Sequence, residues 1–363
     1  MIQMSPSILL IDDNKTNLDS LAARLQERLP NVGVRSWWPT EADGSPADAF
    51  RRQVDAGTVV VVTDYDLTTT MKGLFGLSIV AWCQKDSIPV GDFSRGNVAA
   101  LPKEPNLFEL RVPSDEAGAV DFITAVYGGF TAIREAIRGR PELRSERSLA
   151  AVLSTILGRP RVESQFAAYM SRLGAANSAL LQKLREYAGE QVKPDDEEKI
   201  RLLTYVLGHV LSNAVLKYPG PILSLRALCA YLATTADEAV ELAALFETAR
   251  YTGPFGESSN HFWHDDVDAV LDRLGADIVA EQFESFGDFN RHVVEREFGR
   301  KLARHECGRC GGVKGGFWCP FTQRPVCERA DCSVPASSWI PAGAQLSRVE
   351  RDFYDEWAPV LGL

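Results

Sequence analysis

ILLIDDNKTN, residues 8–17, joins four apolar residues directly to two adjacent carboxylates, Asp12 and Asp13. The apolar run predicts a buried strand, and leucines at helical spacing after it predict a helix over residues 16–29. A buried carboxylate lowers stability unless an opposite charge or a metal ion compensates it. The two acids therefore need partners near the end of this strand.

Three further apolar segments continue the alternation of strand and helix. Residues 32–38 and 87–94 are strand candidates, and residues 58–63 are β-branched throughout. A strand that is apolar on both faces is typical of the centre of a parallel sheet. We therefore predict that residues 1–130 form a doubly wound, flavodoxin-like α/β domain with a parallel sheet.

The carboxyl end of the third strand carries another acid, Asp64, in VVVVTDYDL (59–67). Because parallel strands direct their carboxyl ends to one edge of the sheet, Asp64 should lie near Asp12 and Asp13. Three close carboxylates favour a hard cation, and Mg²⁺ prefers oxygen ligands. A carboxylate at such a site can attack phosphorus and become an acyl phosphate. Ser94, at the end of the fourth strand, is placed to hydrogen-bond a phosphoryl oxygen.

The strand ends ILLIDDN, VVVVTDYDL and IPVGDFS resemble, in this order, those of the receiver domains of two-component response regulators. The resemblance covers residues 5–130. It implies that Asp64 is the phosphoacceptor, that the backbone carbonyl of Asp66 reaches Mg²⁺, and that Ser94 is the switch residue. It also implies a protein partner, either a histidine kinase or a downstream effector, and a domain that is not an enzyme in its own right.

The fifth strand leaves two alignments open. Receivers end this strand with a Lys-Pro pair whose lysine contacts the phosphoryl group. AALPKEP (99–105) offers Lys103, but the following helix would then begin too early. LFELRVPSDEAGAVDFITAVY (107–127) is a better succession of strand, proline and helix. This second alignment is favoured, and it puts Val112 in the lysine position and Lys103 in a loop.

Five of the seven cysteines lie in residues 305–363. Without a secretion signal, such a cluster favours metal binding over disulfides. Four thiolates around a tetrahedral Zn²⁺ make a closed, structural site. The candidate ligands are Cys307, Cys310, Cys319, Cys327 and Cys332. Their spacing favours four ligands, which are Cys307, Cys310, Cys327 and Cys332. Cys319 is the first alternative ligand, and His305 is a weaker one. The cluster predicts a small zinc-binding module.

Residues 131–304 lack strand signals, and their apolar residues recur at helical spacing, which predicts an all-α domain. Within it, residues 223–253 have the outline of a helix–turn–helix. The candidate recognition helix begins with Asp237, Glu238 and Glu241, which would face DNA phosphates unfavourably. An ordinary helical hairpin is therefore the favoured interpretation.

A modest basic excess lies between residues 291 and 329 and is a second candidate for contact with nucleic acid. It contains Arg300, Lys301, Arg304, Arg309 and Lys314. The whole chain carries a net charge of −10, whereas binding to phosphates needs an excess of lysine and arginine. A solvated surface is therefore favoured over a nucleic-acid interface.

Neither a membrane-spanning apolar run nor a secretion signal is present, so we expect a cytoplasmic location without membrane contact. We expect a signalling protein and no catalytic output. Phosphorylation of Asp64 would shift the receiver-like domain between conformations and so control protein–protein interactions of the helical and zinc-binding parts. Two alternatives stay open. One is a DNA-binding transcription regulator that uses the helix–turn–helix-like segment or the zinc module, and the other is a scaffold with an inert pseudo-receiver.

Overall fold

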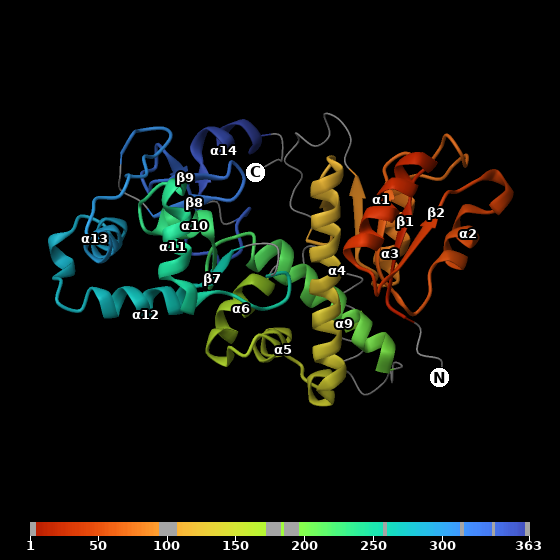
Figure 1. The fold of residues 1–363 in the computed structure, drawn as a ribbon, viewed down its shortest axis with the longest axis horizontal. Helices are drawn as coiled ribbons and strands as arrows, with labels where there is room; N and C mark the ends of the chain where they lie inside the picture. Colours follow the sequence, from red (N-terminus) through yellow and green to blue (C-terminus); the bar gives the residue numbers. More distant parts are fainter. Residues whose placement is uncertain are drawn as a thin grey trace. The chain divides into compact units, whose positions relative to one another are not determined.

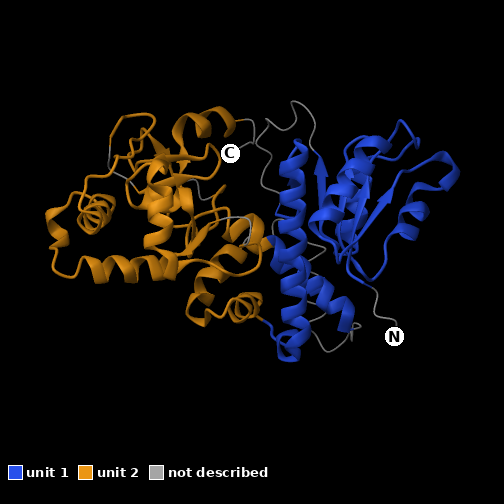
Figure 2. Cartoon of the chain, viewed as in Figure 1, with its two compact units in different colours: residues 1–101, 106–147, 179–209 blue, residues 102–105, 148–178, 210–363 orange. Residues whose placement is uncertain are grey.

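The structure is a computed structural model that divides the chain into two compact units (Figure 2). Unit 1 comprises residues 1–101, 106–147 and 179–209, and unit 2 comprises residues 102–105, 148–178 and 210–363. The structure describes residues 5–93, 107–171, 183–184, 196–256, 260–312, 316–335 and 338–359. The cysteine-rich segment thus shares a unit with the helices between residues 210 and 304.

Unit 1 is built on a parallel sheet flanked by helices (Figure 1). The sheet has five strands in the order β2-β1-β3-β4-β5. Its strands are β1 (Ser7–Ile11), β2 (Gly33–Trp37), β3 (Thr58–Asp64), β4 (Val90–Phe93) and β5 (Leu110–Val112). This is the flavodoxin-like order, so the predicted parallel α/β fold is confirmed. Every residue of β1 and β3 is buried, as expected for strands covered on both faces.

Most helices of unit 1 follow its strands, while one, α9 (Asp196–Val210), comes from a later part of the chain. The others are α1 (Lys15–Arg28), α2 (Pro46–Gln53), α3 (Gly76–Lys85) and α4 (Glu116–Gly139), with 3₁₀ turns at Glu41–Asp43 and Pro141–Arg144. Helix α1 begins directly after the acids because Asn14 caps it. The Asn14 side-chain oxygen accepts the backbone N–H groups of Thr16 at 3.1 Å and Asn17 at 3.2 Å. Residues 8–17 therefore contain the end of β1, the two acids and the capped start of α1.

Helices α4 and α9 lie side by side (Figure 1), and aromatic rings fill the contact between them. Phe108, which precedes β5, stacks on Tyr205 with ring centroids 5.3 Å apart. The His209 ring contacts Phe108, Phe130 and Tyr205 edge-on at centroid distances of 4.6–5.5 Å. Gly208 permits this approach, because a Cβ atom there would lie 2.2 Å from the Phe130 ring. Helix α9 thus completes the core around α4.

Unit 2 combines helices with short antiparallel strand pairs. One pair, Ile222–Ser224 with His261–Trp263, lies within residues 131–304, so the prediction of an all-α domain there is wrong; strands of three residues are too short to show a period in the sequence. Its helices are α5 (Leu149–Ile156), α6 (Glu163–Met170), α10 (Leu225–Tyr231), α11 (Ala239–Leu245), α12 (His264–Leu274), α13 (Phe286–Phe298) and α14 (Arg351–Trp357). Its strand pairs are β6 (Ile222–Ser224) with β7 (His261–Trp263), β8 (Phe317–Cys319) with β9 (Arg324–Val326), and β10 (Ser333–Val334) with β11 (Val349–Glu350). Single helical turns lie at Pro160–Val162, Leu211–Val215, Ala236–Glu238, Glu247–Ala249 and Ala280–Gln282.

One hydrophobic core joins the helices of unit 2 to the cysteine-rich segment. Leu228 of α10, Phe262 of β7 and Val293 of α13 are fully buried in it. Trp318 of β8 and Leu346 belong to the same cluster, and the Trp318 N–H donates to the Leu346 carbonyl at 2.9 Å. The segment around the cysteines is therefore not packed only on itself, and its stability is coupled to that of the helices.

Candidate metal centres

The acids of residues 8–17 meet Asp64 at the carboxyl edge of the sheet. Strands β1 and β3 are neighbours, and Ile11 pairs in register with Thr63. Asp12 and Asp13 follow Ile11, while Asp64 follows Thr63, so the acids come from adjacent strand ends. A carboxylate oxygen from each of the three acids lies within 4.8 Å of the others.

Nearby polar groups hold the carboxylates in place. Asp12 and Asp64 are buried and Asp13 is half-buried. The Asn14 backbone N–H donates to Asp12 Oδ1 at 2.7 Å, and the Thr69 hydroxyl donates to Asp13 Oδ2. Three ionised carboxylates this close repel one another, and a divalent cation relieves that repulsion. The oxygen donor set of Asp12, Asp13 and Asp64 therefore fits Mg²⁺, as the sequence predicted.

Two neighbouring residues were not singled out by the sequence. Trp38 Nε1 donates to the Asp13 carbonyl at 2.9 Å. Gly76, the first residue of α3, is close to the end of β3, because a Cβ atom there would lie 2.2 Å from the Asp64 carbonyl oxygen. Trp38 and Thr69 lie in loops and Gly76 begins α3, and no sequence spacing marks any of the three in advance.

Asp66 does not join the carboxylate cluster with its side chain. Its Oδ1 accepts the Thr68 hydroxyl at 2.6 Å and the Thr68 backbone N–H at 3.0 Å. These two bonds lower the pKa of the exposed Asp66 carboxyl. The side chain thus stabilises the turn after β3, while the role expected for Asp66 at the metal concerns its backbone carbonyl and stays a prediction.

The strand register shows which residues lie beside Asp64 across the sheet. Asp64 pairs with Phe93, and Phe93 pairs with Val112. Strand β5 ends at Val112 and is followed by Pro113 and α4, as the second alignment of the fifth strand predicted. An apolar, buried valine therefore occupies the strand end where receivers carry lysine. Ser94 and Lys103, the other two predicted site residues, lie outside the described residues.

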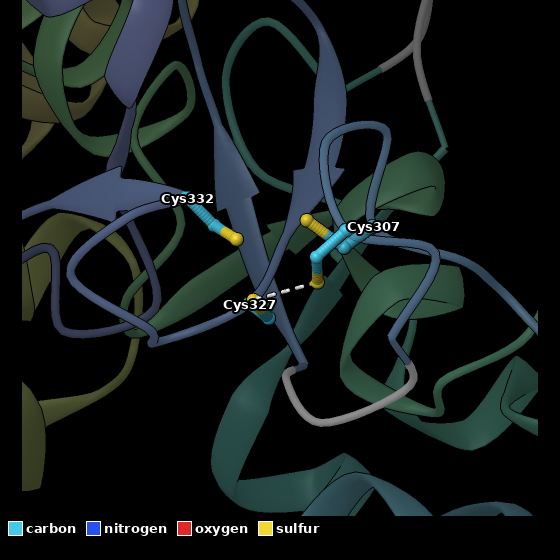
Figure 3. Close-up of side chains that lie close together, drawn as sticks. Cys307, Cys327 and Cys332 are labelled. Atoms are coloured by element: carbon cyan, nitrogen blue, oxygen red, sulfur yellow. Dashed lines mark hydrogen bonds between the residues drawn. The ribbon is translucent and has the colours of Figure 1, made fainter.

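The structure brings together the four cysteines that the spacing favoured. The sulfur atoms of Cys307, Cys310, Cys327 and Cys332 lie within 4.8 Å of one another. Cys310 Sγ and Cys327 Sγ are 3.7 Å apart, and Figure 3 shows the thiols of Cys307, Cys327 and Cys332 pointing toward one another. Cys319 lies outside this group, where its sulfur accepts the Glu350 backbone N–H at 3.3 Å.

Two tight turns present the thiols. In the first, the Cys307 N–H donates to the Gly312 carbonyl at 2.9 Å, and Gly311 N–H donates back to the Cys307 carbonyl at 2.9 Å. Gly311 has φ +62°, a conformation that favours glycine. In the second, the Cys332 N–H donates to the Arg329 carbonyl at 2.8 Å. Each turn contributes two sulfur atoms to the same point, which is the arrangement of a closed Cys₄ site.

The pKa values of the thiols favour a bound cation. Burial opposes ionisation of Cys307, but backbone N–H groups of Cys310 and Arg309 outweigh it and lower its pKa to about 7. Burial and the neighbouring thiols raise the pKa of Cys327 and of Cys332. Close thiols resist ionising together unless a metal ion compensates their charge, and a set of four cysteine sulfur atoms fits Zn²⁺.

His305, the weaker zinc candidate, lies outside the cysteine cluster. It is 3% exposed, and its backbone N–H donates to the Ala233 carbonyl at 3.2 Å. Burial lowers the pKa of its imidazole to about 4, so the ring is neutral near pH 7. His305 thus belongs to the packed interior of unit 2.

Acidic partners neutralise the basic residues that were candidates for nucleic-acid contact. Arg300 donates to Glu238 at 2.6 Å and to Glu241 at 2.6 Å. Ion pairs of the same kind join Lys301 to Glu295, Arg304 to Asp288, and Arg309 to Asp352. Lys314 lies outside the described residues. Because these cations already have carboxylate partners, the described part of the segment does not form a free basic surface for phosphates.

Comparisons with known proteins add no family assignment. No protein-family model matches the chain, and no curated protein matches it either. Among the helices that the structure describes, none has both the length and the apolar character needed to cross a bilayer. The functional argument therefore rests on the two clusters of side chains.

Proposed function

We propose that this chain is a receiver-type signalling protein. Asp12, Asp13 and Asp64 bind Mg²⁺, and Asp64 accepts a phosphoryl group that alters protein–protein interactions of the helical and cysteine-rich parts. The observation that carries the proposal is the convergence of three carboxylates at adjacent strand ends of a sheet with the order 2-1-3-4-5. Ligands of such sheets bind at the carboxyl ends of the strands.

The proposed reaction follows from these positions. A carboxylate oxygen of Asp64 attacks the phosphorus of a phosphodonor, the bond from phosphorus to the leaving group breaks, and an acyl phosphate forms. Asn14 and Thr69 orient the carboxylates of Asp12 and Asp13 through hydrogen bonds. When bound, Mg²⁺ would neutralise charge shared by the carboxylates and the phosphoryl oxygens. Val112 supplies no cation at the end of β5, so the metal carries more of this charge compensation than it would beside a lysine.

A protein partner fits this proposal better than nucleic acid does. The phosphodonor or effector would be a protein, such as a histidine kinase or a downstream component. The DNA-binding alternative is disfavoured because Arg300 is paired with the acids at the start of the candidate recognition helix. The inert scaffold keeps the same acids, and only a measurement of phosphoryl transfer separates it from the proposed function.

The test uses the full chain with Mg²⁺ and a small acyl-phosphate donor, followed by intact-mass measurement. We expect one phosphoryl adduct in the wild type and none in Asp64→Asn. Asp13→Ala should raise the Mg²⁺ concentration needed for half-maximal modification at least tenfold, because it removes one of three ligands.

The matched control is Asp121→Asn, which alters an exposed acid on α4 and should be modified like the wild type. A wild-type chain without adduct, under conditions that modify a known receiver, would support the inert scaffold instead.

A further inference from the structure

A cavity of about 600 Å³ opens next to the cysteine cluster in unit 2. It lies between α13 and the two cysteine turns, and its walls include His292, Arg304 and Arg329. A single water needs only about 10–15 Å³ of such space, so small polar molecules have ample room. The charged walls keep the cavity hydrated, which admits water-soluble reagents.

The cavity reaches two of the four clustered thiols. Cys310 and Cys327 belong to its lining, whereas Cys307 and Cys332 do not. Cys327 is buried at 1% exposure, like Cys307 and Cys332. Cys310 is the exposed member of the cluster. The Cys310 sulfur lies 3.7 Å from the Cys327 sulfur. The thiol that a small reagent reaches first, Cys310, therefore already has the Cys327 thiol as a neighbour.

We propose that Cys310 and Cys327 form a redox modification site, at which a hydroperoxide entering through this cavity converts the two zinc thiolates into a disulfide and releases the metal. The inference is independent of phosphorylation at Asp64. It rests on the Cys₄ zinc site and adds a chemical input to it.

The reaction balances in two steps. The Cys310 thiolate attacks the hydroperoxide, whose O–O bond breaks, and one proton is taken up to give Cys310 sulfenic acid and water or an alcohol. The Cys327 thiolate then attacks the sulfenic sulfur, and the departing hydroxide takes up a second proton to become water. The two cysteines lose two electrons, and the hydroperoxide gains them.

The distance between the two sulfur atoms and the loss of two zinc ligands explain why oxidation would release the metal. The two sulfur atoms must approach from 3.7 Å to about 2.05 Å. Gly311 and Gly312 follow Cys310 in an exposed turn, so the backbone there can adjust. Zinc would keep only Cys307 and Cys332, and a structural site that loses two of four ligands no longer holds the metal. Because metal binding contributes folding free energy, oxidation would loosen the cysteine-rich segment.

The experiment treats the zinc-loaded full chain with hydrogen peroxide. Zinc release is followed with a chromogenic chelator, and disulfides are mapped by peptide mass spectrometry without reduction. We expect one zinc released per disulfide, with Cys310 joined to Cys327, and recovery after a thiol reductant and zinc are added. Release with a Cys307–Cys332 disulfide, or without any disulfide, would overturn the proposal.

A variant separates oxidation from loss of a ligand. Cys310→His keeps a Cys₃His ligand set, which also binds zinc, but removes the accessible thiol. It should release zinc at least tenfold more slowly than the wild type, whereas Cys229→Ala, in the core of α10, should behave like the wild type. Equal release rates for Cys310→His and the wild type would contradict the assignment. If Cys310→His purifies without zinc, the disulfide map of the wild type decides.

Discussion

Gly76 determines how closely α3 approaches Asp64. A Cβ atom at this position would lie 2.2 Å from the Asp64 carbonyl oxygen and 2.9 Å from Tyr65 Cα, and both contacts are with backbone that cannot rotate away. Gly76→Ala should therefore destabilise unit 1 by about 1–3 kcal/mol, the usual range for overpacking. It should also reduce modification of Asp64. Hydrogen exchange of β3 amides and the intact-mass assay would measure the two effects.

Gly128 provides the control for Gly76. It lies inside α4, and a Cβ atom there would meet no neighbour within 4 Å. Gly128→Ala should stabilise unit 1 by about 0.5–1 kcal/mol, because alanine loses less conformational freedom than glycine in a helix. If both variants changed stability by the same amount, the close approach at Asp64 would not be the cause.

His209 makes unit 1 sensitive to acid. Burial among aromatic rings lowers the pKa of its imidazole to about 3, below its usual value of 6.5. Between these values the unfolded chain binds a proton that the folded chain does not, so stability falls as the pH drops below 6.5. This contribution amounts to about 2 kcal/mol between pH 7 and pH 5. In His209→Leu it should be absent.

Hydrogen exchange of β1 and β3, corrected for the intrinsic exchange rate at each pH, would report this loss. The comparison is made within each variant, so a different starting stability of His209→Leu does not matter. An equal pH dependence in both proteins would show that other groups cause the acid sensitivity.

Single residues differ in how far the sequence could predict them. Asp12, Asp13 and Asp64 directly follow apolar strands, and parallel strands share a carboxyl edge, so their convergence could be predicted. Thr69 could not, because it reaches Asp13 from a loop 56 positions away in the sequence. Whether a threonine in a loop faces an acid depends on the conformation of the loop, and hydrophobic periodicity does not predict that conformation.

At the level of elements, the strands of unit 1 were easier to predict than the packing partners of helices, whereas the short strands β6 and β7 were missed. The apolar stripe of α9 predicts the helix, but it does not say which helix covers it. The structure pairs α9 with α4, where Arg134 and Arg138 both donate to Glu197. Burial opposes ionisation of Glu197, yet hydrogen bonds from Arg134 and Arg138 outweigh it and lower its pKa. These ion pairs join two segments that are far apart in the sequence, and no sequence pattern predicts that the two segments meet.

The cysteine turns illustrate the opposite case. The CxxC spacing of Cys307 and Cys310, with glycines around it, predicts a turn that presents two thiols to one ion. The choice among the remaining cysteines needed the fold, because Cys319 lies at the end of β8 and points to the backbone of β11. Strand pairing, which is not local, therefore separates Cys319 from the cluster.

At the level of the whole molecule, the two units should respond differently to loss of zinc. Unit 1 has its own core beneath the sheet, whereas Trp318 and Leu346 join the cysteine-rich segment to the helical core of unit 2. Elemental analysis should find about one zinc per chain, as one Cys₄ site binds one ion. Chelation should then increase hydrogen exchange in α10 and α13 and leave β1 and β3 protected. A metal-free chain with unchanged protection in α10 would argue against a structural zinc.

The most direct test of the proposed function is to locate the phosphoryl group. An acyl phosphate on aspartate can be trapped by borohydride, which reduces it to homoserine, and peptide mass spectrometry then identifies the residue. After incubation with a small phosphodonor, we expect homoserine at position 64 only when Mg²⁺ is present, and none in Asp64→Asn. Reduction at another acid, or no reduction at all in a chain that binds Mg²⁺, would contradict the claim that Asp64 is the phosphoacceptor.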